Sequence, residues 1–433
     1  MALSTSHEVL ITTGTSEQSW SACAWDILTG SSIRTFKGVT VGRRGLCVQA
    51  NHTIIGASAT KPFLQLWGLT KREDNQQKIV CPGKVTSLAV SFDGLYCVAS
   101  IAEKLYVWEM NTGGLLAVLV GHYLTVTVIR FTDDGNYFVT GSDDGIVSAW
   151  SLADVISTTV SSATGPKPWH KWSAHPLAIK DIHVGCGGAL ARVISCSIDQ
   201  TCKMWDINSG ELMQTFVHED EVHSVTMDKL ELRLFAGLKN GDICSTPLYA
   251  QQWQKEHHPS SANTDSDQMV LKGHMDVVTC LSVSFDGSLL VSGSADNTVK
   301  VWNIFSGRLN YTLDHKGQVT NILLVLMDAP KYRISHQRPV PSFMQQLVSQ
   351  QEKKVDRVFN LDIQNISQSS CCGVKRDYSR LLTSTEIPKE ETVQKKDKKE
   401  AINQTNLVQE LARLKQINQD MYTFITKNIV KPS

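Results

Sequence analysis

Tryptophan recurs along the sequence at a nearly constant spacing, and this constrains the fold more than any other feature. Six of the ten Trp residues end short runs of β-forming residues: Trp25, Trp67, Trp108, Trp150, Trp205 and Trp302. The steps between them are 42, 41, 42, 55 and 97 residues. The step of 97 residues contains one further repeat that lacks the Trp. Phe235–Gly241 (FAGLKNG) aligns with Val139–Gly145 (VTGSDDG), and this alignment places Thr246 where a Trp is expected. The sequence therefore predicts seven repeats of about 42 residues.

A histidine forms a second landmark in the well-formed repeats. It stands 28 residues before the Trp position, or 30 in one repeat, and the pairs are His122 with Trp150, His175 with Trp205, His218 with Thr246 and His274 with Trp302. Between the landmarks, apolar runs alternate with turn residues, which indicates three strands, and a fourth follows the Trp. Two long steps contain insertions, at residues 151–168 and 251–268.

This pattern resembles the WD-repeat family, whose GH…WD units form the four-stranded blades of a β-propeller. Trp25-Asp26 and Trp205-Asp206 carry the WD dipeptide itself, whereas the other repeats keep only the Trp. The resemblance covers about residues 7–327. It implies an all-β fold, a seven-bladed WD-repeat β-propeller over residues 1–329.

Ring closure can also be predicted from the sequence. The first repeat has only three strand-like runs, near Glu8–Thr13, Ser19–Ile27 and Ser31–Lys37. One further apolar run, Val319–Met327, follows the last repeat. We expect this run to supply the missing strand of the first blade, because closing the ring removes an exposed edge.

In three repeats a His, a Ser or Thr, an Asp and the Trp occur at matching positions. These tetrads are His122, Thr140, Asp144 and Trp150; His175, Ser195, Asp199 and Trp205; and His274, Ser292, Asp296 and Trp302. The family resemblance implies that the Asp holds the His and that the indole N–H completes a buried relay. Each such hydrogen bond contributes about 0.5–1.5 kcal/mol to stability.

A Ser, His and Asp combination also occurs in hydrolases. Three copies of the set and the absence of a Gly-x-Ser-x-Gly motif argue against that interpretation. The sequence also contains no phosphate-binding loop and no metal-ligand cluster. We therefore expect a protein that is not an enzyme and that binds no cofactor.

Charge divides the chain into an acidic body and a basic tail. Residues 1–330 carry 24 basic and 31 acidic side chains, and residues 331–433 carry 18 and 11. The N-terminal sequence lacks a basic region followed by a long apolar stretch, and the longest apolar runs have six residues. Neither a secretory signal nor a membrane span is expected. The eleven Cys are accordingly expected to be reduced thiols.

The tail contains two different segments. Residues 330–401 show little periodicity and are predicted to be a disordered basic linker. Within it, residues 395–399 (KKDKK) are either part of a solvated linker or a nuclear-localisation or RNA-contacting patch. Residues 402–430 are predicted to form an amphipathic, coiled-coil-like helix, whose 3.5-residue seam consists of Leu407, Leu411, Leu414, Asn418, Met421 and Ile425. This seam predicts self-association or partner binding, the alternative being packing against the propeller.

Four stretches carry a closer resemblance: Gln76–Leu88, Gly187–Leu212, Lys272–Ile304 and Arg413–Ser433. They are similar to the WD repeat-containing protein 18 family. This resemblance implies a non-enzymatic scaffold subunit of a nuclear complex for large ribosomal subunit maturation and pre-rRNA processing. It implies the nucleolus and nucleoplasm as location, with some protein in the cytoplasm. The implied partners are a proline-, glutamate- and leucine-rich scaffold protein, a HEAT-repeat protein, the pre-ribosomal particle and the AAA ATPase midasin.

Two other functions of WD-repeat propellers are alternatives. Many substrate receptors of cullin ubiquitin ligases carry Arg two residues after the WD Asp. Here the tetrapeptides are WDIL, WGLT, WEMN, WSLA, WDIN and WNIF, so this interpretation is disfavoured. A cytoplasmic signalling or dynein-assembly adaptor remains the alternative, and localisation discriminates it.

Overall fold

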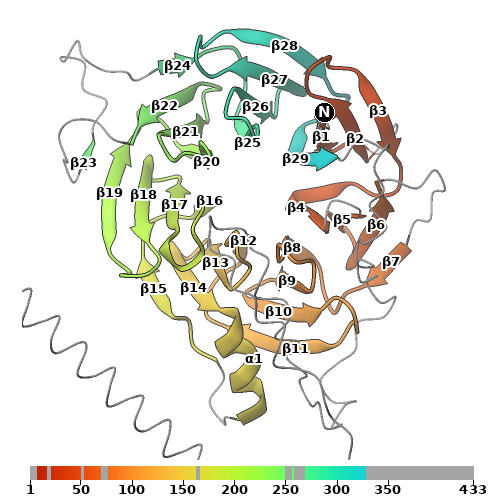
Figure 1. The fold of residues 1–433 in the computed structure, drawn as a ribbon, viewed down its shortest axis with the longest axis vertical. Helices are drawn as coiled ribbons and strands as arrows, with labels where there is room; N and C mark the ends of the chain where they lie inside the picture. The colour runs from red at the N-terminus through yellow and green to blue at the C-terminus, as the bar shows by residue number, and fades with distance from the viewer. Residues whose placement is uncertain are drawn as a thin grey trace, which may run out of the picture. The chain divides into compact units, whose positions relative to one another are not determined.

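The computed structural model describes residues 7–16, 21–49, 53–69, 77–161, 166–248, 256–257 and 269–327. Seven β-sheets are arranged as blades around a central axis, and we call the region that their inner strands enclose the channel (Figure 1). The predicted seven-bladed propeller is therefore confirmed. The predicted linker, and the predicted helix with its seam residues Leu407, Leu411, Leu414, Asn418, Met421 and Ile425, lie outside the described residues.

Each blade contains four strands that follow one another from the channel outward. Blade one contains β29 (Val319–Met327), β1 (His7–Gly14), β2 (Ala22–Asp26) and β3 (Ser32–Phe36). Blade two contains β4 (Val41–Gln49), β5 (Thr53–Ser58), β6 (Phe63–Gly68) and β7 (Gln77–Val80). Blade three contains β8 (Val85–Val90), β9 (Tyr96–Ile101), β10 (Lys104–Glu109) and β11 (Leu115–Val120). Blade four contains β12 (Val126–Phe131), β13 (Tyr137–Ser142), β14 (Ile146–Ser151) and β15 (His170–Ser173).

The remaining three blades follow the same order. Blade five contains β16 (Ile179–Val184), β17 (Arg192–Ser197), β18 (Thr201–Asp206) and β19 (Leu212–Val217), and the short β23 (Glu256–His257) pairs with its edge in parallel. Blade six contains β20 (Val222–Met227), β21 (Arg233–Leu238), β22 (Ile243–Pro247) and β24 (Met269–Leu271). Blade seven contains β25 (Val278–Val283), β26 (Leu289–Ser294), β27 (Thr298–Asn303) and β28 (Leu309–Asp314).

The hairpins between the first and second strands of the blades define one face of the ring. In blade seven this turn is Ser284-Phe-Asp-Gly287, where Asp286 accepts a hydrogen bond from the amide of Ser288 at 3.0 Å. Gly287 has φ 71°, a conformation that glycine adopts without strain. We call this side of the ring the hairpin face. The opposite side, where loops lead into the inner strands, is the loop face.

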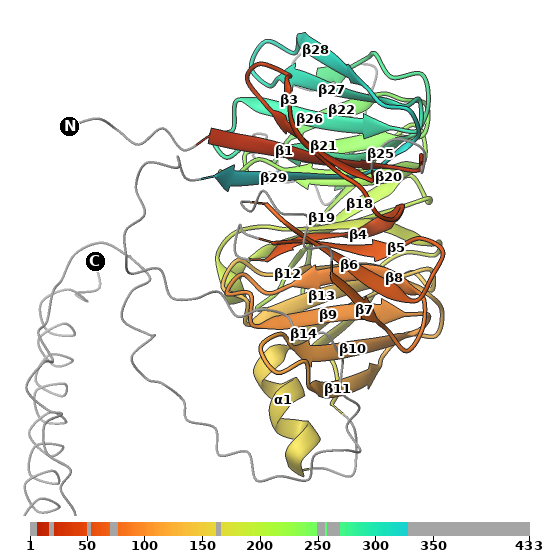
Figure 2. The same cartoon turned by 90° about the vertical axis from the view of Figure 1, so that its right-hand side faces the viewer.

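The ring is closed by pairing the first strand of the sequence with the last. β29 lies antiparallel to β1, from His7 opposite Met327 to Gly14 opposite Val319. Both β1 and β29 therefore have their free ends on the hairpin face (Figure 2). A second link joins the outer strands, because the Tyr311 hydroxyl of blade seven donates to the Ile27 carbonyl of blade one.

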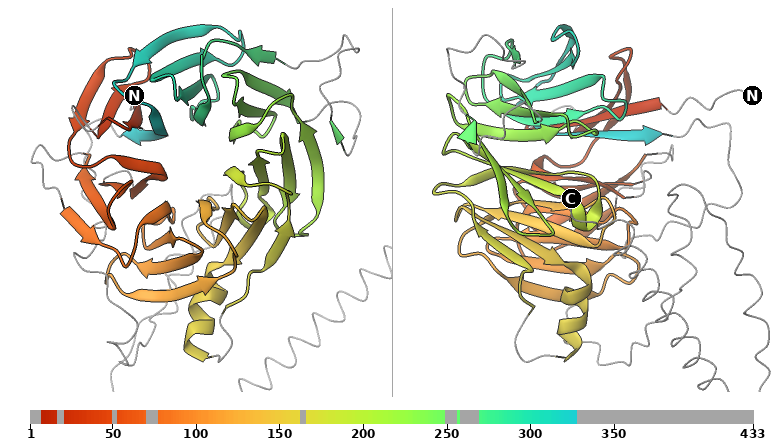
Figure 3. Two further views of the ribbon diagram at one scale, coloured as in Figure 1. Left: turned by 180° about the vertical axis from the view of Figure 1, so that it is seen from behind. Right: turned by 60° about the vertical axis from the view of Figure 1, so that its left-hand side comes forward.

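An α-helix lies in the insertion after β14, where the sequence pattern indicates only a Ser/Thr-rich segment. α1 (Leu152–Ser161) begins after Ser151, whose hydroxyl accepts a hydrogen bond from the Asp154 amide at 3.3 Å. Leu152 and Val155 are buried one turn apart in the apolar cluster that contains Trp150. Figure 3 shows α1 at the outer edge of the ring. In the described part of the chain, no helix is long and apolar enough to cross a membrane.

Candidate interaction surface

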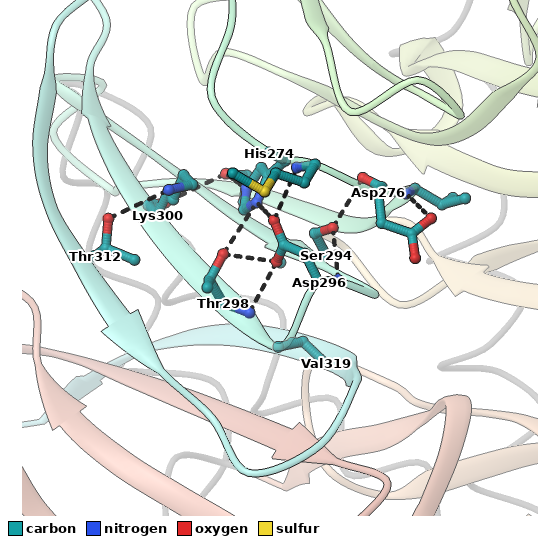
Figure 4. Close-up of polar contacts among 12 residues, drawn as sticks. His274, Asp276, Ser294, Asp296, Thr298, Lys300, Thr312 and Val319 are labelled. Carbon is teal, nitrogen blue, oxygen red and sulfur yellow. Dashed lines mark hydrogen bonds and ion pairs between the residues drawn. The ribbon is translucent and has the colours of Figure 1, made fainter.

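The three predicted tetrads are each brought together, in blades four, five and seven. The His Nε2 lies 2.8 Å from the hydroxyl oxygen of Thr140, Ser195 or Ser292. The His Nδ1 lies 3.3, 2.8 and 2.9 Å from the carboxylates of Asp144, Asp199 and Asp296. The indole N–H of Trp150, Trp205 or Trp302 donates to the same hydroxyl at 3.1, 3.3 and 2.9 Å. Figure 4 shows the contacts of His274 and Asp296 in blade seven.

In the tetrads of blades four and seven, the protonation of the histidine follows from its burial. Burial lowers the pKa of His122 and His274, so these rings are neutral at neutral pH. An ionised carboxylate only accepts hydrogen bonds, so Nδ1 carries the proton and Nε2 accepts from the hydroxyl. Burial alone would raise the pKa of Asp296, but hydrogen bonds from Thr298 and His274 outweigh it and lower that pKa.

The tetrads have the residue types of a hydrolase triad but not its accessibility. Thr140, Ser195 and Ser292 are each 0% exposed, so none of these hydroxyls can reach a substrate. Each hydroxyl also accepts the indole N–H, which occupies a lone pair that a nucleophile would use. The geometry is that of a structural relay between strands.

The tetrads hold the loops in front of them in place. The Asp144 carboxylate accepts the amide of Tyr123 at 3.0 Å, and the Asp296 carboxylate accepts the amide of Met275 at 3.1 Å. These two residues directly follow the tetrad histidines, and their side chains are 77% and 92% exposed. In blade five Pro176 occupies this place and has no N–H to donate, and the exposed Leu177 follows it.

A set of exposed apolar side chains therefore stands on rigid supports around the loop face. We call this set the apolar rim, and it consists of Tyr123, Leu124, Leu177 and Met275. Lys171 lies above the Tyr123 ring, with its Nζ 4.7 Å from the ring centre. The anchored backbone at Tyr123 and Met275 reduces the loop ordering that binding requires, so the apolar rim is a candidate protein-interaction surface.

Blade one contains a related arrangement that the repeat spacing does not reveal. The Trp25 indole N–H donates to the Thr12 hydroxyl at 2.8 Å, and the buried His315 lies with its ring 5.8 Å from the Trp25 ring. His315 precedes β29, so its neighbours in blade one lie about 300 residues earlier in the sequence. In the other blades with a relay, the His precedes the innermost strand. The sequence signal for His315 is therefore its position just before the closing run Val319–Met327.

Blade six confirms the hidden repeat but lacks the relay. Leu234 pairs with Thr246 in the same register as Phe138 with Trp150. The position of the relay hydroxyl is occupied by Ala236, and that of the Asp by Asn240. The Thr246 hydroxyl is buried without a hydrogen-bond partner among the described residues.

A second feature that sequence reasoning missed lies in the channel. The register of β4 against β5 shifts between Val41 and Leu46, so that the segment Gly42-Arg-Arg-Gly45 bulges from the strand. Arg44, with φ 56°, reaches Asp181 of blade five at 2.5 Å. Arg43 donates to the carbonyls of His223 and Thr279 at 2.6 and 3.1 Å, in blades six and seven. We call Arg43, Arg44 and Asp181 the channel brace; its signal in the sequence is two arginines between glycines in an apolar strand.

Comparison with known proteins agrees with this geometry. The family described as WD domain, G-beta repeat matches residues 113–151, 166–206 and 266–303, which are the three segments that carry the tetrads. The chain is 36% identical to WD repeat-containing protein 18 of Homo sapiens over 98% of this chain and 99% of that protein. The protein of the same name from Danio rerio is 34% identical over the same shares. Pre-rRNA-processing protein pro-1 of Caenorhabditis elegans is 27% identical over 69% of this chain and 57% of that protein. The chain, with its propeller and a similarity that extends over nearly its whole length, therefore belongs to the WD repeat-containing protein 18 family.

Proposed function

We propose that this chain is a non-enzymatic scaffold subunit that acts in maturation of the large ribosomal subunit and in pre-rRNA processing. The observation that carries the proposal is the similarity to relatives, one of which is named a pre-rRNA-processing protein. The buried tetrad hydroxyls support a structural rather than a catalytic role for the three tetrads.

In this proposal, the chain acts as a scaffold by presenting the apolar rim to partner proteins. The tetrads of blades four and seven anchor the loops that carry Tyr123 and Met275, so these two residues are presented without rearrangement of the backbone. Burial of exposed apolar area favours binding, and the entropy lost by both partners offsets part of this gain. Different blades can hold different partners because each loop is anchored within its own blade.

The partners in this proposal are those of the family. They are a proline-, glutamate- and leucine-rich scaffold protein, a HEAT-repeat protein, the pre-ribosomal particle and midasin. The chain works in the nucleolus and nucleoplasm, with some protein in the cytoplasm, and associates with itself through residues 402–430. The basic residues 331–433 add a weak, salt-sensitive attraction to RNA.

The test is affinity purification of the tagged chain from nuclear and cytoplasmic extracts, combined with rRNA profiling after its depletion. We expect recovery of the proline- and glutamate-rich scaffold and accumulation of unprocessed large-subunit precursor. Re-expression of a Tyr123→Ala and Met275→Ala variant should restore processing less well than Phe305→Ala, which removes an exposed ring on the hairpin face. A cytoplasmic partner set with normal rRNA processing would contradict the proposal and favour a signalling or dynein-assembly adaptor.

A further inference from the structure

Three arginines of the inner strands lie near a single carboxylate. Arg43 and Arg44 enter it from β4, and Arg130 lies on β12. Among the described residues, Asp181 is the one carboxylate that pairs with these guanidinium groups, at 2.5 Å from Arg44 and 3.8 Å from Arg130. Three positive charges therefore face one negative charge.

Asp181 is already occupied by other donors. Its carboxylate accepts the amides of Ile182 at 2.9 Å and Val225 at 3.1 Å, besides the bond to Arg44. It therefore has little capacity to neutralise a second arginine. Arg43 and Arg44 also donate to the backbone carbonyls of His223 and Thr279. These carbonyls accept hydrogen bonds from the guanidinium groups, but they do not neutralise the positive charges.

Part of the donor capacity of the two arginines is unused. The Nε atoms of Arg43 and Arg44 are buried and have no hydrogen-bond partner among the described residues. Desolvation and the neighbouring charge of Arg44 lower the pKa of Arg43 to about 10. A buried charge without a counter-charge is costly, so an anion bound here would be stabilised by these groups.

The arginine cluster is open to solvent at Arg130. The Arg130 side chain is 39% exposed although it lies on an inner strand, so solvent reaches it. A cavity of about 180 Å³ adjoins the inner strands of blades five, six, seven and one, and His183, Thr226, Lys229 and Ser282 are among its lining residues. Burial, together with the charges of Arg130 and Lys229, lowers the pKa of His183 to about 3, so this ring adds no positive charge at neutral pH.

We propose that the central channel binds a small multivalent oxyanion of the phosphate class beside Arg43, Arg44 and Arg130. Guanidinium groups bind phosphate oxygens through paired N–H donors, which favours a tetrahedral oxyanion over chloride. Asp228 also lines the cavity, and its carboxylate repels an anion near Lys229. None of the three arginines lines this cavity, so the anion is placed beside the arginines and not in the cavity.

The test uses the purified full-length chain, titrated calorimetrically with inorganic phosphate and with pyrophosphate, and with chloride at matched ionic strength. We expect saturable binding of phosphate and tighter binding of pyrophosphate, with none for chloride. Arg43→Gln should weaken phosphate binding by about tenfold or more, because it removes one charge. Lys239→Gln, at an exposed cation on the loop face, is the matched control and should bind as the wild type does.

Loss of phosphate binding in a variant could also result from misfolding, so a second variant is chosen that should bind phosphate more tightly. Asp181→Asn keeps the shape of the side chain but removes the competing negative charge, so phosphate should bind several-fold more tightly, which a misfolded chain would not do. Absence of saturable phosphate binding by the wild type would overturn the proposal. So would equal affinities for the wild type, Arg43→Gln and Asp181→Asn, or an equal loss in Lys239→Gln. Because the isolated chain is measured, these outcomes do not depend on its role in ribosome maturation.

Discussion

At each tetrad, one hydroxyl oxygen joins two aromatic rings that come from different parts of the blade. In blade seven the Ser292 hydroxyl contacts His274 Nε2 at 2.8 Å and accepts the Trp302 indole N–H at 2.9 Å. Removing the hydroxyl leaves two buried polar atoms without this partner. The cost of losing it should therefore exceed that of an ordinary hydrogen bond.

Ser292→Ala should consequently lower the free energy of unfolding of the propeller by about 1–3 kcal/mol. The physical cause is the desolvation of the ring nitrogens of His274 and Trp302, since the volume change is small. Differential scanning calorimetry of the variant measures the effect. Ser306→Ala, in the exposed turn before β28, is the control and should unfold within about 0.5 kcal/mol of the wild type. Similar losses in both variants would contradict the argument.

His315 makes stability depend on pH. Burial lowers its pKa from 6.5 to about 4 in the folded chain, although Asp314 opposes the shift. The unfolded chain therefore binds a proton below pH 6.5, where the folded chain does not. The resulting stability is fully present above pH 6.5 and is lost as the pH falls towards about 4, by up to about 3 kcal/mol.

The unfolding temperature of the wild type should accordingly fall between pH 6.5 and 4.5, and that of His315→Gln should fall less steeply in this interval. The unfolding temperature of the variant should still fall to some extent with pH, because the pKa values of His122 and His274 are also lowered. Thermal unfolding monitored by circular dichroism at several pH values measures both curves. Identical slopes for the two proteins would show that His315 is not responsible.

Among the strands, β29 is the one that closes the ring. It pairs with β1 along its full length, and the Asn321 side chain donates to Thr13 and to the Gly42 carbonyl of blade two at 3.0 and 2.8 Å. Without this strand, β1 presents an unpaired edge to the channel, and edges of this kind pair with other chains.

A chain that ends at residue 317 should therefore form aggregates, whereas a chain that ends at residue 329, which retains β29, should remain monodisperse. Both lack the predicted helix, so its self-association does not enter the comparison. Size-exclusion chromatography with light scattering distinguishes the outcomes. A folded, monodisperse chain of residues 1–317 would show that the ring does not need β29.

Sequence patterns predicted the elements whose signals lie within one repeat. The Trp and His spacing indicated the seven blades, and His274 and Trp302 lie only 28 residues apart. Contacts across the ring have no such local signal. Arg44 and Asp181 are 137 residues apart, and their contact depends on a bulge that no repeat position marks. α1 was missed because it has only 10 residues, so the helical spacing of Leu152, Val155, Ile156 and Val160 is too short to stand out in a Ser/Thr-rich segment.

For the whole molecule, the proposed self-association would place two propellers in one assembly. Two linked copies of a binding surface raise the effective concentration of the second site without any new contact. The seam that would join them, from Leu407 to Ile425, lies outside the described residues, so it stays a prediction.

Leu411→Asp combined with Leu414→Asp should yield a folded monomer with weakened assembly into larger complexes, because two charges in the seam cannot be buried against a second helix. Light scattering gives the mass of wild type and variant. Gln409→Asp combined with Gln416→Asp adds the same charge on the opposite side of the predicted helix and should leave the mass of the wild type unchanged. Equal masses for the wild type and the seam variant would contradict self-association through this helix.

The pairing of β1 with β29 also sets an order of events during synthesis. The two strands are separated by roughly 300 residues, and ribosomes add about 5–20 residues per second. β1 therefore emerges on the order of 15–60 s before its partner strand exists. Blades two to seven can each be completed from a continuous stretch of nascent chain, whereas blade one waits for almost the entire propeller to be translated. The N-terminal strands are thus the part of the nascent chain that most needs protection by a chaperone.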